Sequence, residues 1–371
     1  MKRAGNLFPK LISDSNIRTA IETVCRTHRW HHYPDKPNRT VLWILSTMDD
    51  RVREMRTMIL EGFEPSPVRK KKRYDHSAGK WREITEPMIW PDQCVHHALI
   101  QVLEPTMMRG MDHWCCGSIQ GRGTHYGIKA MKKWMKRGKG TKYCVELDIR
   151  HFYDSLKPEI VLARFRKLIK DRRVLDLVWS VIKDGIQIGA YCSQWFANTV
   201  LQPLDQLIRK SGASHYIRYM DNFTILTKRK RDAHRLVIIV GEWLRGQDLR
   251  LKDNWQVFRT SGRLPDAMGY RFGSGYTLIR KKNLIRLKHQ LSRYGRLYEC
   301  GKHVTAKFAQ GLLSRLGMLR HCNSTALYEK IYKRKTQKRL KDVVRDYYRR
   351  ETDKWNTYLE QCAATAGWLR T

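Results

Sequence analysis

The clearest alternation of hydrophobic and polar positions lies in the middle of the chain. Residues 142–147 alternate with a period of two, which is typical of a half-buried strand, and Asp148 follows them directly. Two further β-rich runs, at 215–219 and 223–227, flank Met-Asp-Asn, and this arrangement predicts a hairpin with polar residues at its tip. Asp148 is therefore expected near the end of one strand, and Asp221 on a tight turn between two others.

Helical periodicity accounts for most of the remaining chain. We expect helices over residues 12–28, 41–61, 92–103, 158–169, 173–183, 193–209, 232–245, 283–294, 305–319 and 326–358. Between 141 and 275 strands and helices alternate, which predicts an antiparallel sheet with helices on one face. The fold class that follows is α+β.

The two aspartates are candidates for metal-dependent chemistry. An aspartate at a strand end or hairpin tip, taken alone, is usually turn chemistry, because its side chain bonds the nearby backbone. Nucleotide addition, however, requires two Mg²⁺ ions about 4 Å apart that stabilise the attacking and leaving oxygens. Because Mg²⁺ prefers oxygen ligands, carboxylates from two strand segments suffice to hold it. Asp148 and Asp221 are thus the expected ligands of Mg²⁺, with Mn²⁺ as an alternative.

Four stretches in a fixed order resemble the motifs of reverse transcriptases. They are VELDIRHFYDSL at 145–156, GIQIGAYCSQWFANTVLQPLDQ at 185–206, HYIRYMDNFTIL at 215–226 and MGYRF at 268–272. The first resembles the motif whose aspartate binds both metals, and RYMDN resembles the tyrosine-any-Asp-Asp box. Most relatives have Gln-Gly, three residues and Ser-Pro where residues 188–194 read IGAYCSQ, and this variant resembles the lineage of diversity-generating retroelements.

The resemblance implies a right-hand polymerase and an RNA-directed DNA polymerase activity. Its parts would be a helical N-terminal extension at 1–65, fingers at 66–140, a catalytic palm at 141–275 and a basic helical thumb at 276–371. The implied partners are template RNA, the RNA–DNA duplex, deoxynucleoside triphosphates and a small basic accessory protein. Enzymes of this lineage copy a template RNA into error-bearing cDNA.

Several nucleotide-binding residues follow from the same resemblance. Tyr153 matches an aromatic gate whose ring would collide with a ribose 2′-hydroxyl. Arg82 and Lys80 match the basic groups that meet the triphosphate, since the planar arginine fork suits phosphate oxygens. Arg122 would serve the template backbone or the nucleotide, and Gly189 would let the chain pass close under the templating base. The alternatives are a core aromatic for Tyr153 and solvated surface roles for the basic residues.

Three positions complete the implied site. Ile188 stands where most relatives have glutamine, which implies looser base selection, although an ordinary buried isoleucine is the alternative. Gln194 ends the lineage signature and is assigned with Ile188 to nucleotide binding. Gly269 belongs to the MGYRF stretch, which would grip primer or product.

Asn222 departs from the family pattern. It replaces the second aspartate of the box, and a neutral amide cannot supply a carboxylate's charge to a metal. Two other interpretations therefore stay open besides the retroelement enzyme. One is a reverse transcriptase of another bacterial lineage, such as a phage-defence or retron-like enzyme; the other is an RNA-binding scaffold that has lost catalysis.

Composition fits a polyanionic partner. The 371 residues include 73 Lys and Arg against 35 Asp and Glu, a formal net charge of +38, so nucleic acid is the expected partner. The basic run at 69–73 is either solvated or a nucleic-acid contact. No run approaches roughly 18 apolar residues and no signal-peptide core follows Met1, so we expect a cytoplasmic protein with no membrane partner. The resemblance implies that it is bacterial or phage-encoded. Of the nine cysteines, Cys115 and Cys116 are adjacent and the rest are scattered, and we expect them to be reduced thiols.

Overall fold

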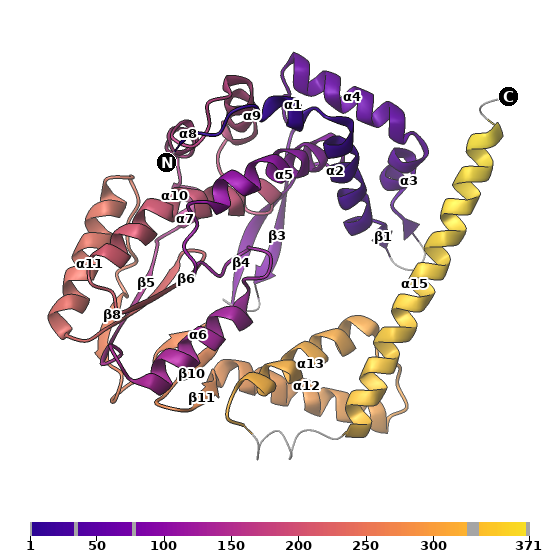
Figure 1. Cartoon of the computed structure of the whole chain (residues 1–371). Helices are drawn as coiled ribbons and strands as arrows, with labels where there is room; N and C mark the ends of the chain where they lie inside the picture. Colours follow the sequence, from indigo (N-terminus) through magenta and orange to yellow (C-terminus); the bar gives the residue numbers. More distant parts are fainter. Residues whose placement is uncertain (1, 33–35, 76–78, 325–333, 369–371) are drawn as a thin grey trace.

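The chain folds into a ring of helices and small antiparallel sheets (Figure 1). The computed structural model describes residues 2–32, 36–75, 79–324 and 334–368. The N-terminal helices lead into the largest sheet, the C-terminal helices follow, and the last helix returns toward the N-terminal part. The mixture of helices and antiparallel sheets confirms the α+β class.

The N-terminal part is more broken than the sequence pattern predicts. Its elements are α1 (Phe8–Leu11), α2 (Asp14–Thr27), β1 (Trp30–His32), β2 (Lys36–Pro37), α3 (Arg39–Ser46) and α4 (Met48–Glu61). The single helix expected over 41–61 is wrong, because Thr47 has φ −122° and ψ 33° and separates α3 from α4. The Thr47 hydroxyl donates to the carbonyl of Trp43 at 2.8 Å, and this side-chain bond competes with helix continuation.

A basic hairpin follows. The strands β3 (Arg69–Asp75) and β4 (Lys80–Glu86) pair antiparallel, with Arg69 opposite Glu86. A π-helical turn at Ile89–Gln93 then leads into α5 (Cys94–Met108), which is longer than the predicted helix at 92–103.

The largest sheet carries the two candidate aspartates. Its strands lie in the order β6 (His215–Tyr219), β7 (Asn222–Thr227), β5 (Tyr143–Asp148) and β8 (Gln256–Arg259), all antiparallel. The helices around it are α6 (Thr124–Arg137), α7 (Phe152–Ser155), α8 (Pro158–Arg166), α9 (Arg172–Ile182), α10 (Tyr191–Lys210) and α11 (Lys230–Arg245). The hairpin predicted around residues 220–222 is confirmed.

Both faces of this sheet are covered, so the prediction of helices on one face is wrong. Val145 and Ile225 join the main core together with side chains of α10 and α11. Cys144 and Leu226 point to the opposite face, where α6 and a small sheet pack against them. Alternate residues along β5 and β7 are therefore buried on opposite sides, which is why hardly any polar position marks a solvent face.

The C-terminal part is mainly helical. A three-stranded sheet of β9 (Asp266–Ala267), β10 (Tyr270–Phe272) and β11 (Thr277–Ile279) precedes α12 (Lys281–Glu299), α13 (Ala306–Met318), a 3₁₀ turn at Leu319–His321 and α15 (Arg334–Trp368). Residues 326–333 of the last predicted helix lie outside the described part of the chain. In the described ranges, every helix is too short or too polar to cross a bilayer.

Candidate active site

The structure brings Asp148, Asp221 and Asn222 together. Asp148 ends β5 and lies directly opposite Asn222, the first residue of β7. Asp221 lies in the turn between β6 and β7, and the backbone N–H of Ile149 donates to its carbonyl at 3.3 Å. Pairing of β5 with β7 thus places both carboxylates at one end of the sheet.

The surroundings of these carboxylates favour a cation. Asp148 forms an ion pair through Oδ2 with Lys252, whereas its buried Oδ1 accepts no hydrogen bond from the described residues. The Asn222 side-chain amide donates to Asp221 Oδ1 at 3.1 Å. Burial raises the pKa of Asp221 above its usual range, and the nearby charge of Asp148 raises it further.

The donor set therefore fits Mg²⁺, although it is small. Asp148 has a buried oxygen that accepts no hydrogen bond from the described residues, and Asp221 carries a second carboxylate near it. A hard cation would bind such oxygens and reduce the repulsion between the two negative charges. Among the residues that the structure describes, no cluster of three or more acidic, histidine or cysteine side chains forms a fuller cage. The remaining ligands of such an ion would have to come from water, backbone or phosphate oxygens.

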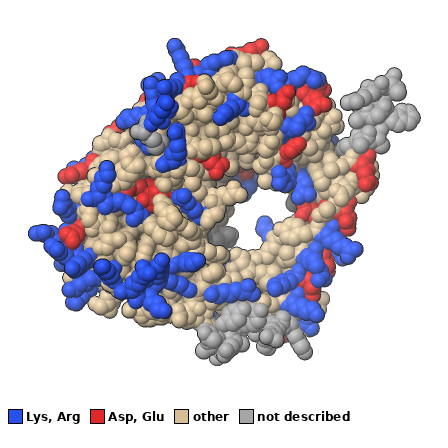
Figure 2. Space-filling model, viewed as in Figure 1, with Lys and Arg blue, Asp and Glu red and all other residues tan. Residues whose placement is uncertain are grey.

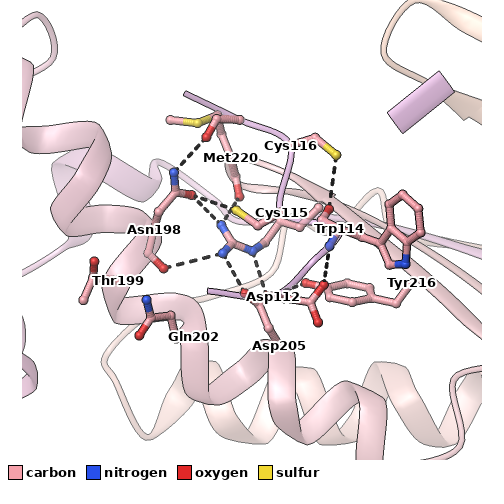
Figure 3. Close-up of polar contacts among 12 residues, drawn as sticks. Asp112, Trp114, Cys115, Cys116, Asn198, Thr199, Gln202, Asp205, Tyr216 and Met220 are labelled. Carbon is pink, nitrogen blue, oxygen red and sulfur yellow. Dashed lines mark hydrogen bonds and ion pairs between the residues drawn. The ribbon is translucent and has the colours of Figure 1, made fainter. Parts of the chain in front are cut away.

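A buried arginine, Arg218, bonds to residues around the Asp221 turn, and Figure 3 shows its partners Asn198, Asp205 and Met220. Arg218 and Asp205 are both 0% exposed, and the guanidinium donates to the carboxylate at 2.8 Å through Nε and at 2.7 Å through Nη2. The Tyr216 hydroxyl donates to the same carboxylate at 2.6 Å. A buried ion pair of this kind is tolerable only because its remaining donors and acceptors are also satisfied.

The same arginine holds the turn itself. Arg218 Nη1 donates to the Asn198 side-chain oxygen at 2.7 Å and to the carbonyl of Met220 at 3.0 Å. Met220 has φ +56°, an unfavourable conformation for a side chain of its size. Gly117 lies against it so closely that a Cβ there would be 2.7 Å from the Met220 nitrogen. The chain thus fixes the residue before Asp221 in one strained conformation.

Tyr153 also lies at this site. It belongs to α7, which follows Asp148 closely in the chain, and its side chain is half-buried. Burial raises the pKa of its hydroxyl, and the negative charge of Asp221 adds to the rise. The Tyr153 hydroxyl is therefore near enough to Asp221 to respond to its charge, and the role of Tyr153 as an aromatic gate stays a prediction.

Gly189 has a structural requirement that the sequence did not reveal. Its φ is +119°, and a Cβ there would collide with the backbone carbonyl of Thr85 in β4. The N–H of Thr85 donates to the carbonyl of Ile188 at 2.8 Å. Ile188 is half-buried at this junction, and the exposed Gln194 lies with Gly189 along one groove. These residues dock the basic hairpin onto the segment before α10.

The other predicted residues belong to other elements of the fold. Arg82 is half-buried in β4, opposite Arg73, and the side chain of its companion Lys80 lies outside the described residues. Arg122 donates through Nη1 to the carbonyl of Asp112 at 2.8 Å, which is a structural contact within its own loop. Gly269 has φ +88°, and its carbonyl accepts from the N–H of Arg280 at 2.9 Å, at the start of the C-terminal helices.

The sequence analysis missed the residues that support the site. Lys252 received no role from the sequence, yet it pairs with Asp148. Asn198 and Asp205 are polar residues seven apart on the apolar face of α10, and Arg218 is a charged residue inside a strand. Buried polar residues at such positions need hydrogen-bonding partners. Their occurrence among apolar neighbours is the feature of the sequence that could have identified them.

Comparisons with known proteins agree with this geometry. The sequence model of the family described as “Reverse transcriptase (RNA-dependent DNA polymerase)” matches residues 68–263, more than half of the chain. Protein YkfC of Escherichia coli (strain K12) is 22% identical over 241 residues, which cover 60% of this chain and 58% of YkfC. Nuclear intron maturase 1, mitochondrial, of Arabidopsis thaliana is 29% identical over 115 residues, 29% of this chain and 15% of the maturase. The chain thus spans less than two thirds of either relative.

Two telomerase structures are also similar. Apo telomerase from Candida tropicalis matches with a TM-score of 0.48 and 11% identity, over 82% of this chain and 66% of that chain. Telomerase from Candida albicans, in complex with a TWJ fragment of telomeric RNA, matches with a TM-score of 0.47 and 13% identity, over 86% and 65%.

Proposed function

The chain belongs to the reverse transcriptase family, and we propose that it is an RNA-directed DNA polymerase that copies a template RNA into cDNA. The single observation that carries this proposal is the pairing of β5 with β7, which sets Asp148 beside the Asp221 turn. The family match covers both residues. The right-hand fold of the family supports the assignment of fingers, palm and thumb to 66–140, 141–275 and 276–371.

The chain's own residues would bind and orient the reactants. Asp148 and Asp221 would hold Mg²⁺, or Mn²⁺ in its place, and the bound metal would stabilise the attacking and leaving oxygens. The amide of Asn222 orients the Asp221 carboxylate through one oxygen and leaves the other free of this bond. The ring of Tyr153 would exclude a ribose 2′-hydroxyl, and Arg82 with Lys80 would meet the triphosphate.

The lineage is a further part of the proposal. The signature at 188–194 supports a diversity-generating retroelement enzyme, with Ile188 relaxing base selection so that copying errs at template adenines. Such an enzyme would act in a bacterial cytoplasm with a small basic accessory protein. Asn222 favours a second candidate, an RNA-binding scaffold without catalysis, because an amide brings no charge to the metal.

Primer extension on an RNA template tests the function. Wild type, Asp221→Ala and Asn222→Asp would be compared in Mg²⁺ and separately in Mn²⁺, and the products would be sequenced opposite template adenines. Asp253→Ala is the matched control, because Asp253 is a nearby carboxylate whose side chain is 95% exposed. We expect extension by wild type and by the control, and none by Asp221→Ala.

The other outcomes decide between the candidates. Extension that appears only in Asn222→Asp would identify a silenced polymerase fold. RNA binding without extension in every variant would support the scaffold. Extension with no excess of errors opposite adenines would contradict the retroelement lineage while leaving the polymerase intact.

A further inference from the structure

An opening passes through the molecule (Figure 2). Three parts of the chain surround it on three sides: the N-terminal helices, the large sheet with the basic hairpin β3–β4, and the helices α12 and α13. The helix α15 closes the fourth side (Figure 1). Lys and Arg side chains lie at the rim of this opening. The chain therefore encloses a hole rather than an open cleft.

The ring closes where α15 packs on Trp30 and on the neighbouring α3, and we call the side-chain contacts around Trp30 the latch. Trp30 donates through its indole N–H to Glu351 of α15 at 2.9 Å. Its ring meets those of Trp355 and Tyr358 edge-on, with centroids 5.6 and 6.0 Å away. Trp355 is 5% exposed and joins the main core, and Leu359 packs against the same core. These five residues form the latch.

Between its contacts with α13 and with the latch, α15 is largely exposed to solvent. Leu340 is buried against α13, and the Tyr348 hydroxyl accepts from Gln310 of α13 at 2.8 Å. Residues 345–350 are then exposed apart from one half-buried tyrosine, until the latch begins at Glu351. From Leu340 to Trp355 the helix rises about 22 Å. α15 is therefore held by α13 near its start and by the latch further along, and residues 345–350 span the distance between these two contacts with few contacts of their own.

A groove beside the latch has a lining that suits nucleic acid, and Trp30 and Tyr358 of the latch form part of it. Among the described residues, Arg39, Arg69, Lys71 and Arg73 line this groove of ≈ 1650 Å³, and Glu86 supplies the one carboxylate of its lining. Aromatic side chains, including Trp90 and Tyr191, line it as well. Basic groups with aromatic faces suit a phosphate backbone and unpaired bases.

This groove joins the latch to the segment before α10. Tyr358 and Gln361 of α15 line it, and so do Gly189 and Gln194. A strand in the groove would therefore run between the helix that closes the ring and the segment assigned to nucleotide binding.

We propose that the opening is a closed passage for the nucleic acid being copied, and that the latch must part for a template without ends to enter it. The proposal rests on the RNA-copying function and adds a topological requirement to it. Three rings, a glutamate and a leucine form this contact, and α15 would stay anchored on α13 when they separate. Enclosure would hold a template through many additions without any sequence-specific contact.

A covalent staple across the latch tests the enclosure. Thr27 and Gln361 are both exposed and both line the groove. Thr27→Cys and Gln361→Cys would be joined by a flexible bismaleimide, in a background carrying Cys300→Ser, Cys322→Ser and Cys362→Ser. The probe is a covalently closed circular RNA with an annealed DNA primer, and no nucleotides are added. The matched control is a linear RNA of the same sequence.

Enclosure predicts a linked complex that no denaturant can dissociate. If the staple is formed after loading, the closed protein ring and the circle should co-migrate in SDS and separate when the RNA is cut once. The linear control should separate in SDS without cutting. Efficient stapling on a bound circle with no SDS-resistant species would overturn the passage while leaving the RNA-copying function standing. If the unstapled protein binds no primed template, the copying function falls and the passage falls with it.

The latch itself is tested by release rates. Trp355→Ala removes the buried ring, and Asn356→Ala is the control at the next position of the same helix, since Asn356 is exposed. We expect Trp355→Ala to release a primed circle on the order of tenfold faster, because such contacts act mainly on dissociation, and Asn356→Ala to behave like wild type. Equal release by all three proteins would refute the role of the latch.

Discussion

Removing the charge of Asp205 gives the sharpest test of how the active-site turn is held. Asp205→Asn keeps the size of the side chain but leaves the Arg218 guanidinium fully buried without a counter-charge. The Asp205 carboxylate accepts three hydrogen bonds, from Tyr216 and twice from Arg218. In the asparagine variant an NH₂ group replaces one of the two oxygens and faces a donor instead of accepting from it. Breaking a buried pair by removing one partner costs about 3–5 kcal/mol.

This cost is large beside the stability of a domain, which is about 5–15 kcal/mol. Urea unfolding followed by circular dichroism would show it as a lower midpoint at an unchanged slope. The control is Asp49→Asn, which removes the same charge from an exposed pair with Arg18 and should cost about 1 kcal/mol or less. An Asp205→Asn midpoint equal to that of Asp49→Asn would refute the reasoning.

A double variant separates stability from positioning. Replacing both partners, as in Asp205→Leu with Arg218→Met, removes the unpaired charge, and such apolar replacements are often neutral in stability. It also removes the donor that holds the carbonyl of Met220 beside Asp221. We expect a stable protein with weak primer extension, and full extension by a stable double variant would contradict the positioning role.

Three further predictions follow from single positions. Gly189→Ala should loosen the basic hairpin, because its Cβ would meet the Thr85 carbonyl, and limited proteolysis between 69 and 86 should report it; unchanged protection would contradict the docking. Tyr153→Ala should admit ribonucleotides, and retained discrimination in primer extension would count against the gate. Burial lowers the pKa of His96 from 6.5 to about 4. As the pH falls from 6.5 to 4, the unfolded state therefore binds a proton at His96 that the folded state does not bind. The free energy of unfolding should fall by as much as about 3 kcal/mol over this pH range. His96→Leu should flatten that slope in urea titrations, and an unchanged slope would refute the assignment.

The sequence was sufficient where local pattern determines structure. Alternation along 142–147 and the polar tip at 220–222 predicted the strand and hairpin that carry Asp148 and Asp221, because a half-buried strand has a period of two. The break at Thr47 escaped, since a single side-chain bond to the Trp43 carbonyl ends the helix without disturbing its periodicity. The sequence also placed a helix up to residue 358, but nothing local indicates that its far end packs on Trp30.

The supporting residues of the site escaped for a related reason. Arg218 and Asp205 are thirteen residues apart on different elements, and only the packing of α10 under the sheet makes them partners. Gly189 carried a role through the family resemblance, whereas its close approach to Thr85 depends on where β4 lies. Contacts of this kind require the tertiary fold.

The basic hairpin β3–β4 has a consequence for how salt experiments are interpreted. Its described side chains are exposed or half-buried, and ion pairs of Arg73 and Lys71 with Glu86 and of Lys70 with Glu83 join its strands. Added salt screens such exposed pairs as it screens phosphate contacts. The fall in template affinity with ionic strength would then contain the loosening of the hairpin as well as counterion release. A phosphate count derived from that slope would overstate the number of contacts.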